Sequence, residues 1–470
     1  MRISSGSYWI WGFSFLLLLS ACRKEQFNTS SDAIISVSSD TIRFDTVFTT
    51  MGSFTQSFKV FNNNDQKLML STIRLMGADS SNFHININGT SASQLSNIEM
   101  EPEDSLYVFV TVTIDPTTAS LPFLINDSIH IAWNGNEKFI HLEAFGQNAH
   151  FVDHGTITGQ ETWNNDLPYV ILNSLYIAPD ATLTVNPGCK IFNHADAPII
   201  VDGSLKVNGE KDNEVIFNGD RLDPDYRDLP ASWPGMIFRT ESKDNVIQFA
   251  IIKNAYQAIS ITAPSSNNNP KLNLHQCIID NAYANGIFAS NSSIDADNTL
   301  ISNCGKNLEI EFGGLYNFTN CTMAAYSNAY LLHSQPVLQL NNYSYASGNL
   351  NTKPLQASFI NSIFWGESGN IVNEIVVSKE GTDVFDVNFN NCIHKNENLP
   401  TNAVFANSIN NISPQFDSID VEHRYYDFRT SLNPLAPGID QGAATNFNYD
   451  LDHTPRMSGT ATDIGCYERQ

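Results

Sequence analysis

The chain has 470 residues, 42% of them hydrophobic, and a formal net charge of −24 from 49 acidic and 25 basic residues. Nucleic acids and anionic membrane surfaces are poor partners for so acidic a protein, and a polyanionic polysaccharide would be repelled unless Ca²⁺ bridged it. The length suffices for two or three domains, and the scattered glycine and proline with frequent asparagine favour short strands and turns.

The first residues predict an export signal. One arginine precedes an apolar run from Tyr8 to Leu19, which is too short to span a bilayer comfortably and is typical of a signal-peptide core. The run ends in LSAC, which resembles a bacterial lipobox, where the signal is cut before a cysteine that is then lipidated; an ordinary secretory signal is the alternative. We expect a signal peptide over 1–21, lipid attachment at Cys22, an anchor linker over 22–33, and a cell-envelope location at the outer membrane, on a side that the sequence leaves open.

Residues 34–150 are predicted to form a β-sandwich. Short alternating runs such as TQSFKVFNNND, SLYVFVTVTIDP and SIHIAWNG are separated by polar turns, and about seven such runs in about 115 residues are typical of that fold. The phrases EPEDSLYVFVTVTIDP and KFIHLEAFGQ resemble the immunoglobulin-like modules of bacterial surface proteins. The resemblance implies a spacer or interaction module above the anchor.

The rest of the chain is a repeat. Its segments align on a column of small residues: Ala250, Cys277, Thr299, Cys321, Ser362 and Cys392. Large residues recur two positions later and three positions earlier, and the alternation slips between the −3 and 0 positions, which indicates a corner between two strands. Four positions after the reference lies a second column, which predicts another corner with left-handed backbone: Asn254, Asn281, Asn303, Ala325, Gly366 and Asn396. With a third short strand, each repeat makes one coil of a parallel β-helix.

Family resemblance supports this fold. The phrases TLTVNPGCKIF, IIVDGSLKVNG, EVIFNG and WPGMIF resemble the opening coils of right-handed parallel β-helix lipoproteins of Bacteroidetes type, which share the pectin-lyase-like fold. The ending DIGCYERQ resembles their terminal segment, with Cys466 where alanine is usual. The predicted fold is therefore all-β: an immunoglobulin-like β-sandwich, then a right-handed parallel β-helix over 165–425 with three strands per coil and about eight coils, and a cap segment over 426–470. The resemblance implies an architecture and no particular reaction.

The small column predicts three buried, unpaired cysteines: Cys277, Cys321 and Cys392. Thr299 and Ser362 separate them, so neighbouring cysteines lie two coils, about 9.6 Å, apart. That separation exceeds the roughly 7 Å limit between the Cα atoms of a disulfide. The sequence leaves the pairing of three others open: Cys189, Cys304 and Cys466.

Outward positions beside the small column supply candidate functional residues. They form a polar patch over three coils: Asn273, His275, Asp295, Asp297, Asn317 and Thr319. The two aspartates are two apart in one strand, about 6.5–7 Å, which suits water-bridged Ca²⁺ or a carboxylate pair acting on a sugar. A solvated sheet face is the competing and commoner interpretation.

Two other acidic groups are weaker candidates. Glu309 and Glu311 repeat the two-apart spacing and could act as a general acid and base, although a charged outer face is the commoner explanation. The loop DRLDPDYRDLP could hold Ca²⁺, the one cofactor considered, but its spacing does not match an EF-hand and a structural role is more usual. Its acidic residues are Asp220, Asp223, Asp225 and Asp228.

Catalytic signatures are missing from the sequence. The chain has no arginine between Arg239 and Arg424, whereas uronate lyases of this fold use Arg or Lys beside bound Ca²⁺, and the motifs of polygalacturonase-type hydrolases do not occur. Charged residues near the C-terminus are predicted to form a cap that covers the last coil and blocks end-to-end stacking: Asp450, Asp452, Arg456, Asp463 and Glu468.

One insertion predicts a recognition loop. The spacing from Cys321 to Ser362 is 41 residues, against 22 for each of the two preceding coils. Extra length in a solenoid goes to a corner, so this segment is expected to project over one face. It carries Tyr343 and Tyr345, which would either offer a sugar-stacking surface or pack against the neighbouring coil.

The sequence favours a lipid-anchored cell-envelope protein whose β-helix binds a neutral or mixed glycan or another surface protein, or has a structural role. The ligand-binding candidates are Asn273, His275, Asn317, Tyr343 and Tyr345. The alternative is a polysaccharide-active enzyme, a glycoside hydrolase or lyase, that uses one of the outward carboxylate pairs.

Overall fold

The computed structural model describes residues 26–116, 122–432, 435–457 and 459–469, so the predicted signal segment and Cys22 lie outside the described residues. The chain forms two compact units, 1–148 and 149–470. Within the described ranges, their regular elements are strands and one short 3-10 helix, η1 (Ala78–Ser80). No helix in the described ranges is long and apolar enough to cross a membrane.

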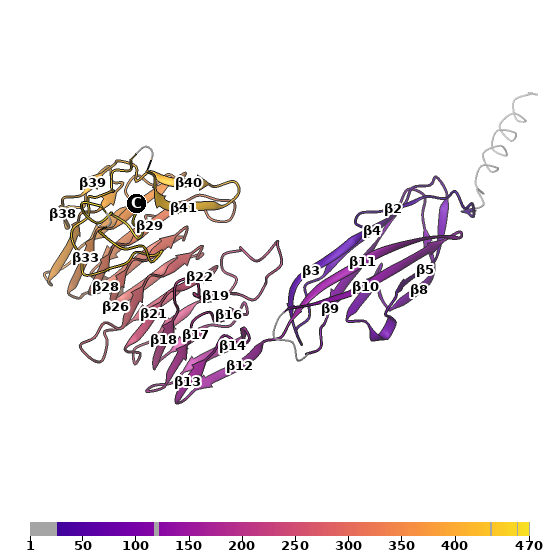
Figure 1. Cartoon of the computed structure of the whole chain (residues 1–470), viewed down its shortest axis with the longest axis horizontal. Helices are drawn as coiled ribbons and strands as arrows, with labels where there is room; N and C mark the ends of the chain where they lie inside the picture. The colour runs from indigo at the N-terminus through magenta and orange to yellow at the C-terminus, as the bar shows by residue number, and fades with distance from the viewer. Residues whose placement is uncertain (1–25, 117–121, 433–434, 458, 470) are drawn as a thin grey trace, which may run out of the picture. The chain divides into compact units, whose positions relative to one another are not determined.

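The first unit is a sandwich of two sheets around one core (Figure 1). One sheet contains β1 (Phe27–Asn28), β5 (Lys67–Leu75), β10 (Phe123–Trp133), β11 (Asn136–Gln147) and β3 (Thr41–Phe48) in this order, with β8 (Gln94–Met100) paired to β5. The other contains β2 (Ile35–Val37), β4 (Gln56–Asn62), β9 (Ser105–Val112), β6 (Phe83–Ile87) and β7 (Thr90–Ser91). Buried and exposed residues alternate along β9, because only one face of its sheet contacts the core.

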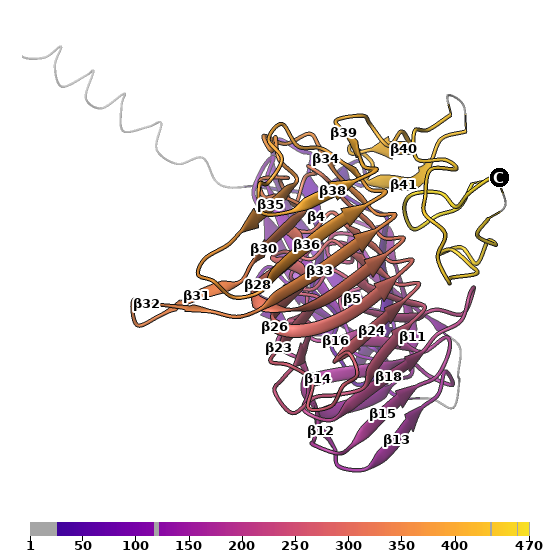
Figure 2. The same cartoon turned by 90° about the vertical axis from the view of Figure 1, so that its left-hand side faces the viewer.

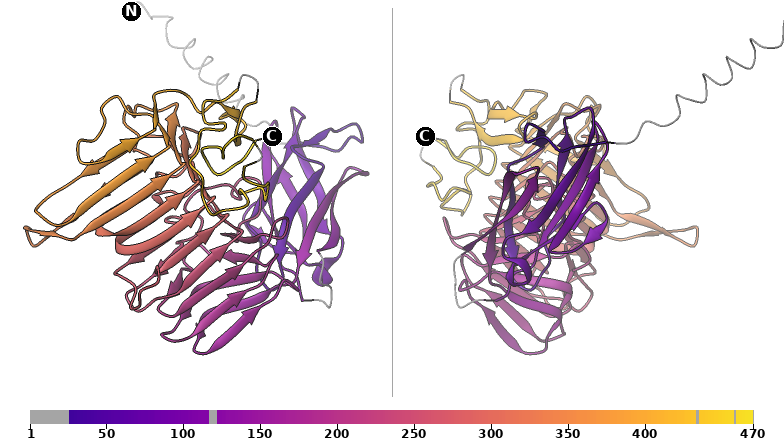
Figure 3. Two further views of the ribbon diagram at one scale, coloured as in Figure 1. Left: turned by 60° about the vertical axis from the view of Figure 1, so that its left-hand side comes forward. Right: turned by 90° about the vertical axis from the view of Figure 1, so that its right-hand side faces the viewer.

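The second unit contains a 26-stranded sheet whose pairings are all parallel and which winds into a β-helix with three faces (Figures 1 and 3). The first face contains β17 (Ile199–Val201), β20 (Met236–Phe238), β23 (Ile259–Thr262), the N-terminal parts of β26 (Asn285–Asp297) and β28 (Lys306–Thr319), β30 (Leu338–Asn341) and β35 (Ile375–Ser378). The long strands β12 (His150–Ile157) and β14 (Tyr169–Ile177) each contribute to the first and third faces.

The second face is a ladder of parallel strands. It contains β13 (Gln160–Trp163), β15 (Thr182–Val185), β18 (Ser204–Asn208), β21 (Asn245–Gln248), β24 (Leu272–His275), the C-terminal parts of β26 and β28, β33 (Leu355–Ile360), β36 (Phe385–Asn390) and β38 (Val404–Ala406). These are ten strands, slightly more than the about eight coils expected.

The third face completes each coil. Its strands are β16 (Lys190–Asn193), β19 (Val215–Gly219), β22 (Ala250–Lys253), β25 (Ile278–Asp280), β27 (Leu300–Ser302), β29 (Thr322–Tyr326), β34 (Ile363–Glu367), β37 (Ile393–His394) and β39 (Ile409–Asn410). The parallel sheet thus runs from His150 to Asn410, whereas the sequence suggested 165–425. The sequence does not indicate the early start, because β12 bends at His154, whose φ of 47° interrupts the alternation within the strand.

The pairing register confirms the repeat alignment. The residues one position after the small column pair in succession across six coils: Ile251, Ile278, Leu300, Thr322, Ile363 and Ile393. The slip in alternation is a corner, since every residue just before the small column has a φ of 43–54°: Phe249, Gln276, Asn298, Asn320, Asn361 and Asn391.

The left-handed backbone predicted for the second corner is confirmed in only three of the six residues of that column. Asn254, Asn281 and Asn303 have φ values of 62°, 59° and 50°, as expected. The later members of that column, Ala325, Gly366 and Asn396, are not among the described residues with positive φ. The reason is that β29 and β34 continue straight through Ala325 and Gly366 instead of turning there.

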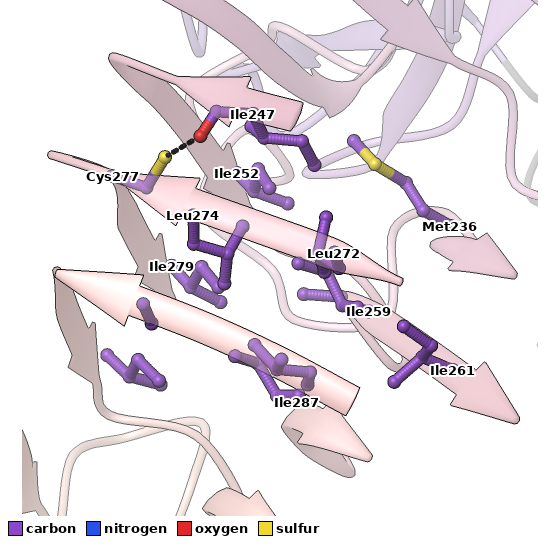
Figure 4. Packing of buried hydrophobic residues seen from close by; sticks show 14 of the residues in the cluster. Met236, Ile247, Ile252, Ile259, Ile261, Leu272, Leu274, Cys277, Ile279 and Ile287 are labelled. Carbon is purple, nitrogen blue, oxygen red and sulfur yellow. Dashed lines mark hydrogen bonds between the residues drawn. The ribbon is translucent and has the colours of Figure 1, made fainter. Parts of the chain in front are cut away.

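The predicted cysteine column is confirmed. All six described cysteines are buried and unpaired, including the three whose state the sequence left open. The Cys277 thiol donates to the carbonyl of Ile247 at 3.3 Å, and isoleucine and leucine side chains surround it (Figure 4). Burial raises the pKa of Cys277 to about 12, so the thiol is inert at neutral pH.

The predicted C-terminal cap over the last coil is wrong. After the antiparallel hairpin β40 (Phe416–Asp420) and β41 (Tyr425–Thr430), the chain returns along the side of the stack. We call residues 439–468 the strap. Its backbone carbonyls at Gln441 and Ala443 accept hydrogen bonds of 2.8 Å from the corner side chains of Asn391 and Asn361.

The strap continues toward earlier coils and packs on the outer side of the third face. Arg456 contacts Asn298, and Tyr467 belongs to a hydrophobic cluster with Leu300 and Ile363. The strap takes this course because the outward side chains of that face are apolar and need a cover. Cys466 lies in the same cluster, and a thiol occupies little more space than the alanine that is usual there.

The insertion forms a hairpin that projects from a corner of the stack, as predicted (Figure 2). Its strands are β31 (Tyr343–Ala346) and β32 (Asn349–Thr352). The ring of Tyr343 meets that of Tyr345 edge-on at 5.9 Å, and Tyr345 is 65% exposed. Tyr345 is therefore available to a ligand.

Candidate functional site

A notch lies at the corner between the first and second faces, with a volume of about 530 Å³. Volumes of 300–1,000 Å³ are usual for ligand pockets. The residues that line it are Pro264, Ser265, Asn267, Asn268, Asn269, Pro270, Asn291, Ser292, Ser293, Asp295, Gly314, Leu315, Asn317, Pro354 and Gln356.

The notch exists because two short coils lie between two long ones. The loop before β24 forms one wall, and Pro354, which follows the projecting hairpin, contributes to the other. Between them, β26 and β28 turn the corner tightly at Asn291 and Gly314 and leave a low floor.

Glycine makes the tight turn of β28 feasible. Gly313 and Gly314 have φ values of 82° and 121°, and a Cβ on Gly314 would come within 2.4 Å of the carbonyl oxygen of Ser292. The buried Tyr316 supports the turn from inside. Its hydroxyl donates to the Gly313 carbonyl at 3.0 Å and accepts from the Ser292 N–H at 3.1 Å.

The loop wall is held by hydrogen bonds and therefore preorganised. Asn267 and Asn269 donate from their side-chain amides to the Asp244 carboxylate at 2.8–3.0 Å, and these bonds lower the pKa of Asp244. Behind the loop, the buried Lys271 ammonium donates to the carbonyls of Arg239, Thr240 and Thr262 at 3.0, 3.2 and 2.7 Å. Burial lowers the pKa of Lys271 to about 8.

The floor combines a carboxylate, amides and one apolar side chain. Asn317 donates from Nδ2 to Oδ1 of Asp295 at 2.7 Å, which leaves Oδ2 without a partner among the described residues. Leu315 is 48% exposed beside them. Such a mixture can hydrogen-bond hydroxyl groups and cover the apolar face of a sugar ring.

The second predicted aspartate is not in the notch. Asp297 is buried and ion-paired with Nδ1 of His275 on the neighbouring coil, and it accepts a hydrogen bond of 2.8 Å from Asn298. The hydrogen bond from His275 to Asp297 raises the pKa of the imidazole. Asp295 and Asp297 share one side of β26, but they have separate partners.

The predicted glutamates lie on the first face. Glu309 is buried, ion-paired with Lys306, and accepts a hydrogen bond of 3.1 Å from Asn285. Burial, followed by the charge of Glu309, raises the pKa of Glu311. Two carboxyl groups of one strand thus have different environments.

Three of the four aspartates of the acidic loop pair with different partners. Asp220 pairs with His194 at 2.6 Å, Asp223 with Arg221 at 2.8 Å, and Asp228 with Arg424 at 3.2 Å, while Asp225 is exposed. Within the described ranges, no group of three or more His, Cys, Asp or Glu residues is placed to hold a metal ion.

The sequence pointed to Asp295 and Asn317 but not to the wall of the notch. Asn267, Asn268, Asn269 and Gln356 lie outside the aligned columns, and Asn273 does not line the notch. The coil spacings do contain a signal for the notch, because two short repeats of 22 residues between longer ones must leave a depression at the corner.

No family model matches the chain, and no curated protein matches it. Solved structures give weak similarities. One is a family 123 glycoside hydrolase from Clostridium perfringens (10% identity, 28% of this chain and 30% of that chain, TM-score 0.19). Others are a protein of unknown function from Porphyromonas gingivalis (8%, 27% and 60%, TM-score 0.19) and the catalytic domain of a family 87 α-1,3-glucanase in complex with tetrasaccharides (11%, 75% and 87%, TM-score 0.16). This chain covers less than a third of the first structure, and TM-scores this low carry no argument about function.

Proposed function

We propose that the protein is a lipid-anchored cell-envelope protein whose β-helix binds a glycan in the notch. The amide-rich lining of this preformed depression carries the proposal. Asparagine and glutamine both donate and accept hydrogen bonds, as sugar hydroxyl groups do. The exposed Leu315 and the three prolines of the lining supply an apolar surface beside them.

The lining favours binding over hydrolysis. Glycosidases generally flank the scissile bond with two carboxyl groups, about 5–5.5 Å or 6.5–9.5 Å apart. The described lining contains one carboxylate, Asp295, since Asp297 is buried in its pair with His275. With one acid, the notch can orient a sugar but lacks the second group that activates water or attacks.

The ligand segment in the notch is expected to be neutral. No Lys, Arg or His belongs to the described lining, and its one carboxylate would repel an anionic sugar. The projecting Tyr345 extends the surface on the side of Pro354 and could stack on a further sugar ring.

A glycan array with a parallel reducing-end assay tests the proposal. The purified protein is expected to bind neutral glycans and to release no reducing ends from those it binds. Absence of any neutral ligand would contradict glycan binding, and release of reducing ends from a bound glycan would contradict a binding role.

One observation supports the alternative, a polysaccharide-active enzyme. Glu309 and Glu311 are two apart on one strand and differ in environment, and different environments separate the roles of acid and base. If reducing ends are released, Glu311→Gln should abolish the activity and Asp295→Asn should not.

A further inference from the structure

A second pocket, of about 230 Å³, lies at a different corner of the β-helix, between the third and first faces. Its floor consists of the corner asparagines Asn254, Asn281 and Asn303. Asn281 donates to Asn254 at 2.7 Å, and Asn254 to Asn218 at 2.9 Å, so the amides form a ladder along the stack. Because these amides hydrogen-bond to one another, we expect the charged side chains above them to recognise a ligand.

Three cations from distant parts of the sequence meet in this pocket. Arg227 comes from the acidic loop, Lys253 from β22, and Arg424 from the hairpin that precedes the strap. The sequence shows no arginine between Arg239 and Arg424, but the returning hairpin places Arg424 against the middle coils. In a chain with a net charge of −24, such a gathering of cations marks a site for an anion.

The carboxylates of the pocket do not fully compensate these cations. One oxygen of Asp228 serves both Arg424, at 3.2 Å, and Arg227, at 3.6 Å. Asp280 lies 3.5 Å from Lys253 and also accepts a hydrogen bond of 2.7 Å from Ser302. Three basic side chains thus face two carboxylates in the described lining, and the pairs are long enough to rearrange around an incoming oxyanion.

A buried donor also lines the pocket. The Tyr426 hydroxyl is shielded from solvent and makes no hydrogen bond of normal geometry within the described ranges. Burial raises the pKa of this tyrosine, and the nearby Asn328 side chain opposes that rise. A buried hydroxyl without a partner is energetically unfavourable. An oxyanion would accept its proton and remove this penalty.

Two stacked tyrosines stand beside the pocket. Tyr256 and Tyr283 follow the floor residues Asn254 and Asn281 by two positions each, on adjacent coils. Their rings lie 5.6 Å apart with an interplanar angle of 25°, and the side chains are 51% and 52% exposed. Exposed aromatic rings on successive coils present a surface on which a sugar can lie.

We propose that this pocket and the adjacent tyrosine pair bind an acidic sugar within an otherwise neutral glycan. The pocket takes a sulfate or carboxylate group, and the tyrosines support the neighbouring ring. Two carboxylates and the overall negative charge oppose a densely charged polyanion, so an isolated acidic group is the better ligand. The site is separate from the notch and does not depend on it.

Calorimetric titration with lactose, sulfated lactose, sialyllactose and sodium sulfate tests the proposal. At least one acidic trisaccharide or sulfated disaccharide should bind about tenfold or more tightly than lactose, because a charge-assisted hydrogen bond is about twice as strong as a neutral one and tenfold in affinity corresponds to only about 1.4 kcal/mol. Arg424→Gln and Arg227→Gln should each reduce this preference about tenfold, and the Tyr256→Ala/Tyr283→Ala double variant should weaken both classes of sugar.

A control variant shows whether a loss of acidic-sugar binding is specific to this pocket. Arg43→Gln, in the other unit, should leave binding of acidic sugars unchanged. Arg227 is more exposed than Arg424, so Arg227→Gln should disturb folding less. It still tests the proposal if Arg424→Gln lowers the melting temperature. Equal affinity for all three sugars, or sulfate binding as tightly as the acidic sugars, would overturn the proposal.

Discussion

Asn317 donates a hydrogen bond of 2.7 Å to the carboxylate of Asp295, and the two residues lie side by side on adjacent strands of the second face. The bond fixes one carboxylate oxygen and turns the other toward the notch. It joins two of the residues that the sequence singled out, whereas Asp297 is paired with His275.

The buried thiols should be alkylated in the denatured protein but not in the native protein. Iodoacetamide should leave all six described cysteines unmodified in the native protein, because burial raises the pKa of thiols such as Cys277 and Cys392 to about 12. After denaturation without reductant, mass spectrometry should find all six labelled. A disulfide between any two of Cys277, Cys321 and Cys392 would contradict the coil stacking.

The pair of His275 and Asp297 predicts a pH dependence of stability. Because the hydrogen bond raises the pKa of His275 in the folded state, its stabilisation is fully present below the unfolded pKa of about 6.5 and is lost as pH rises through the folded value. The melting temperature of the wild type should therefore exceed that of His275→Gln more at pH 5.5 than at pH 8.5. A difference that does not vary with pH would refute the ion pair.

Arg456 is expected to be essential for the strap. Its guanidinium contacts Glu468 at 3.4 Å, and the carbonyls of Asp463 and Gly465 at 3.2 and 2.9 Å, with the Arg456 and Glu468 side chains each 1% exposed. Removing one partner of a buried pair costs about 3–5 kcal/mol, so Arg456→Met should lower the free energy of unfolding by about that amount.

Urea unfolding measures the effect, with Lys243→Met as the control. The pair of Lys243 and Asp180 is exposed, and exposed ion pairs contribute about 1 kcal/mol or less. Equal effects of the two substitutions would show that the strap does not depend on its buried charges.

The proposed lipid anchor predicts a change of location. Cys22→Ala should move the protein from the membrane fraction to the soluble fraction, whereas Cys189→Ala, which removes a core thiol, should not. Fractionation followed by immunoblotting measures this, and unchanged membrane retention of Cys22→Ala would refute the lipoprotein assignment.

The coils could be predicted from the sequence because their pattern is local and repeated. Small residues such as Thr299 and Cys321 recur at one position, and the left-handed corner just before them produces a visible slip in alternation. The strap could not be predicted in the same way. Its course depends on contacts such as that of Arg456 with Asn298, 158 residues apart, and one copy of a segment gives no periodicity.

The candidate site was predictable only where it lies in the repeat. Asp295 and Asn317 occupy outward positions of aligned strands and were found. The wall of the notch was not, because its shape depends on hydrogen bonds of Asn267 and Asn269 to Asp244, a residue more than twenty positions earlier. Hydrogen bonds of single side chains across a corner leave no pattern in the sequence.

The most direct test of glycan binding in the notch compares two substitutions on the glycan array. Leu315→Arg places a long charged side chain over the floor, whereas Val404→Arg makes the same kind of change at an exposed position of β38, on the same face outside the notch. Both variants should keep the melting temperature of the wild type, since neither residue is buried. The account predicts that Leu315→Arg loses the neutral glycans that the wild type binds while Val404→Arg retains them; retention of those glycans by Leu315→Arg would contradict it.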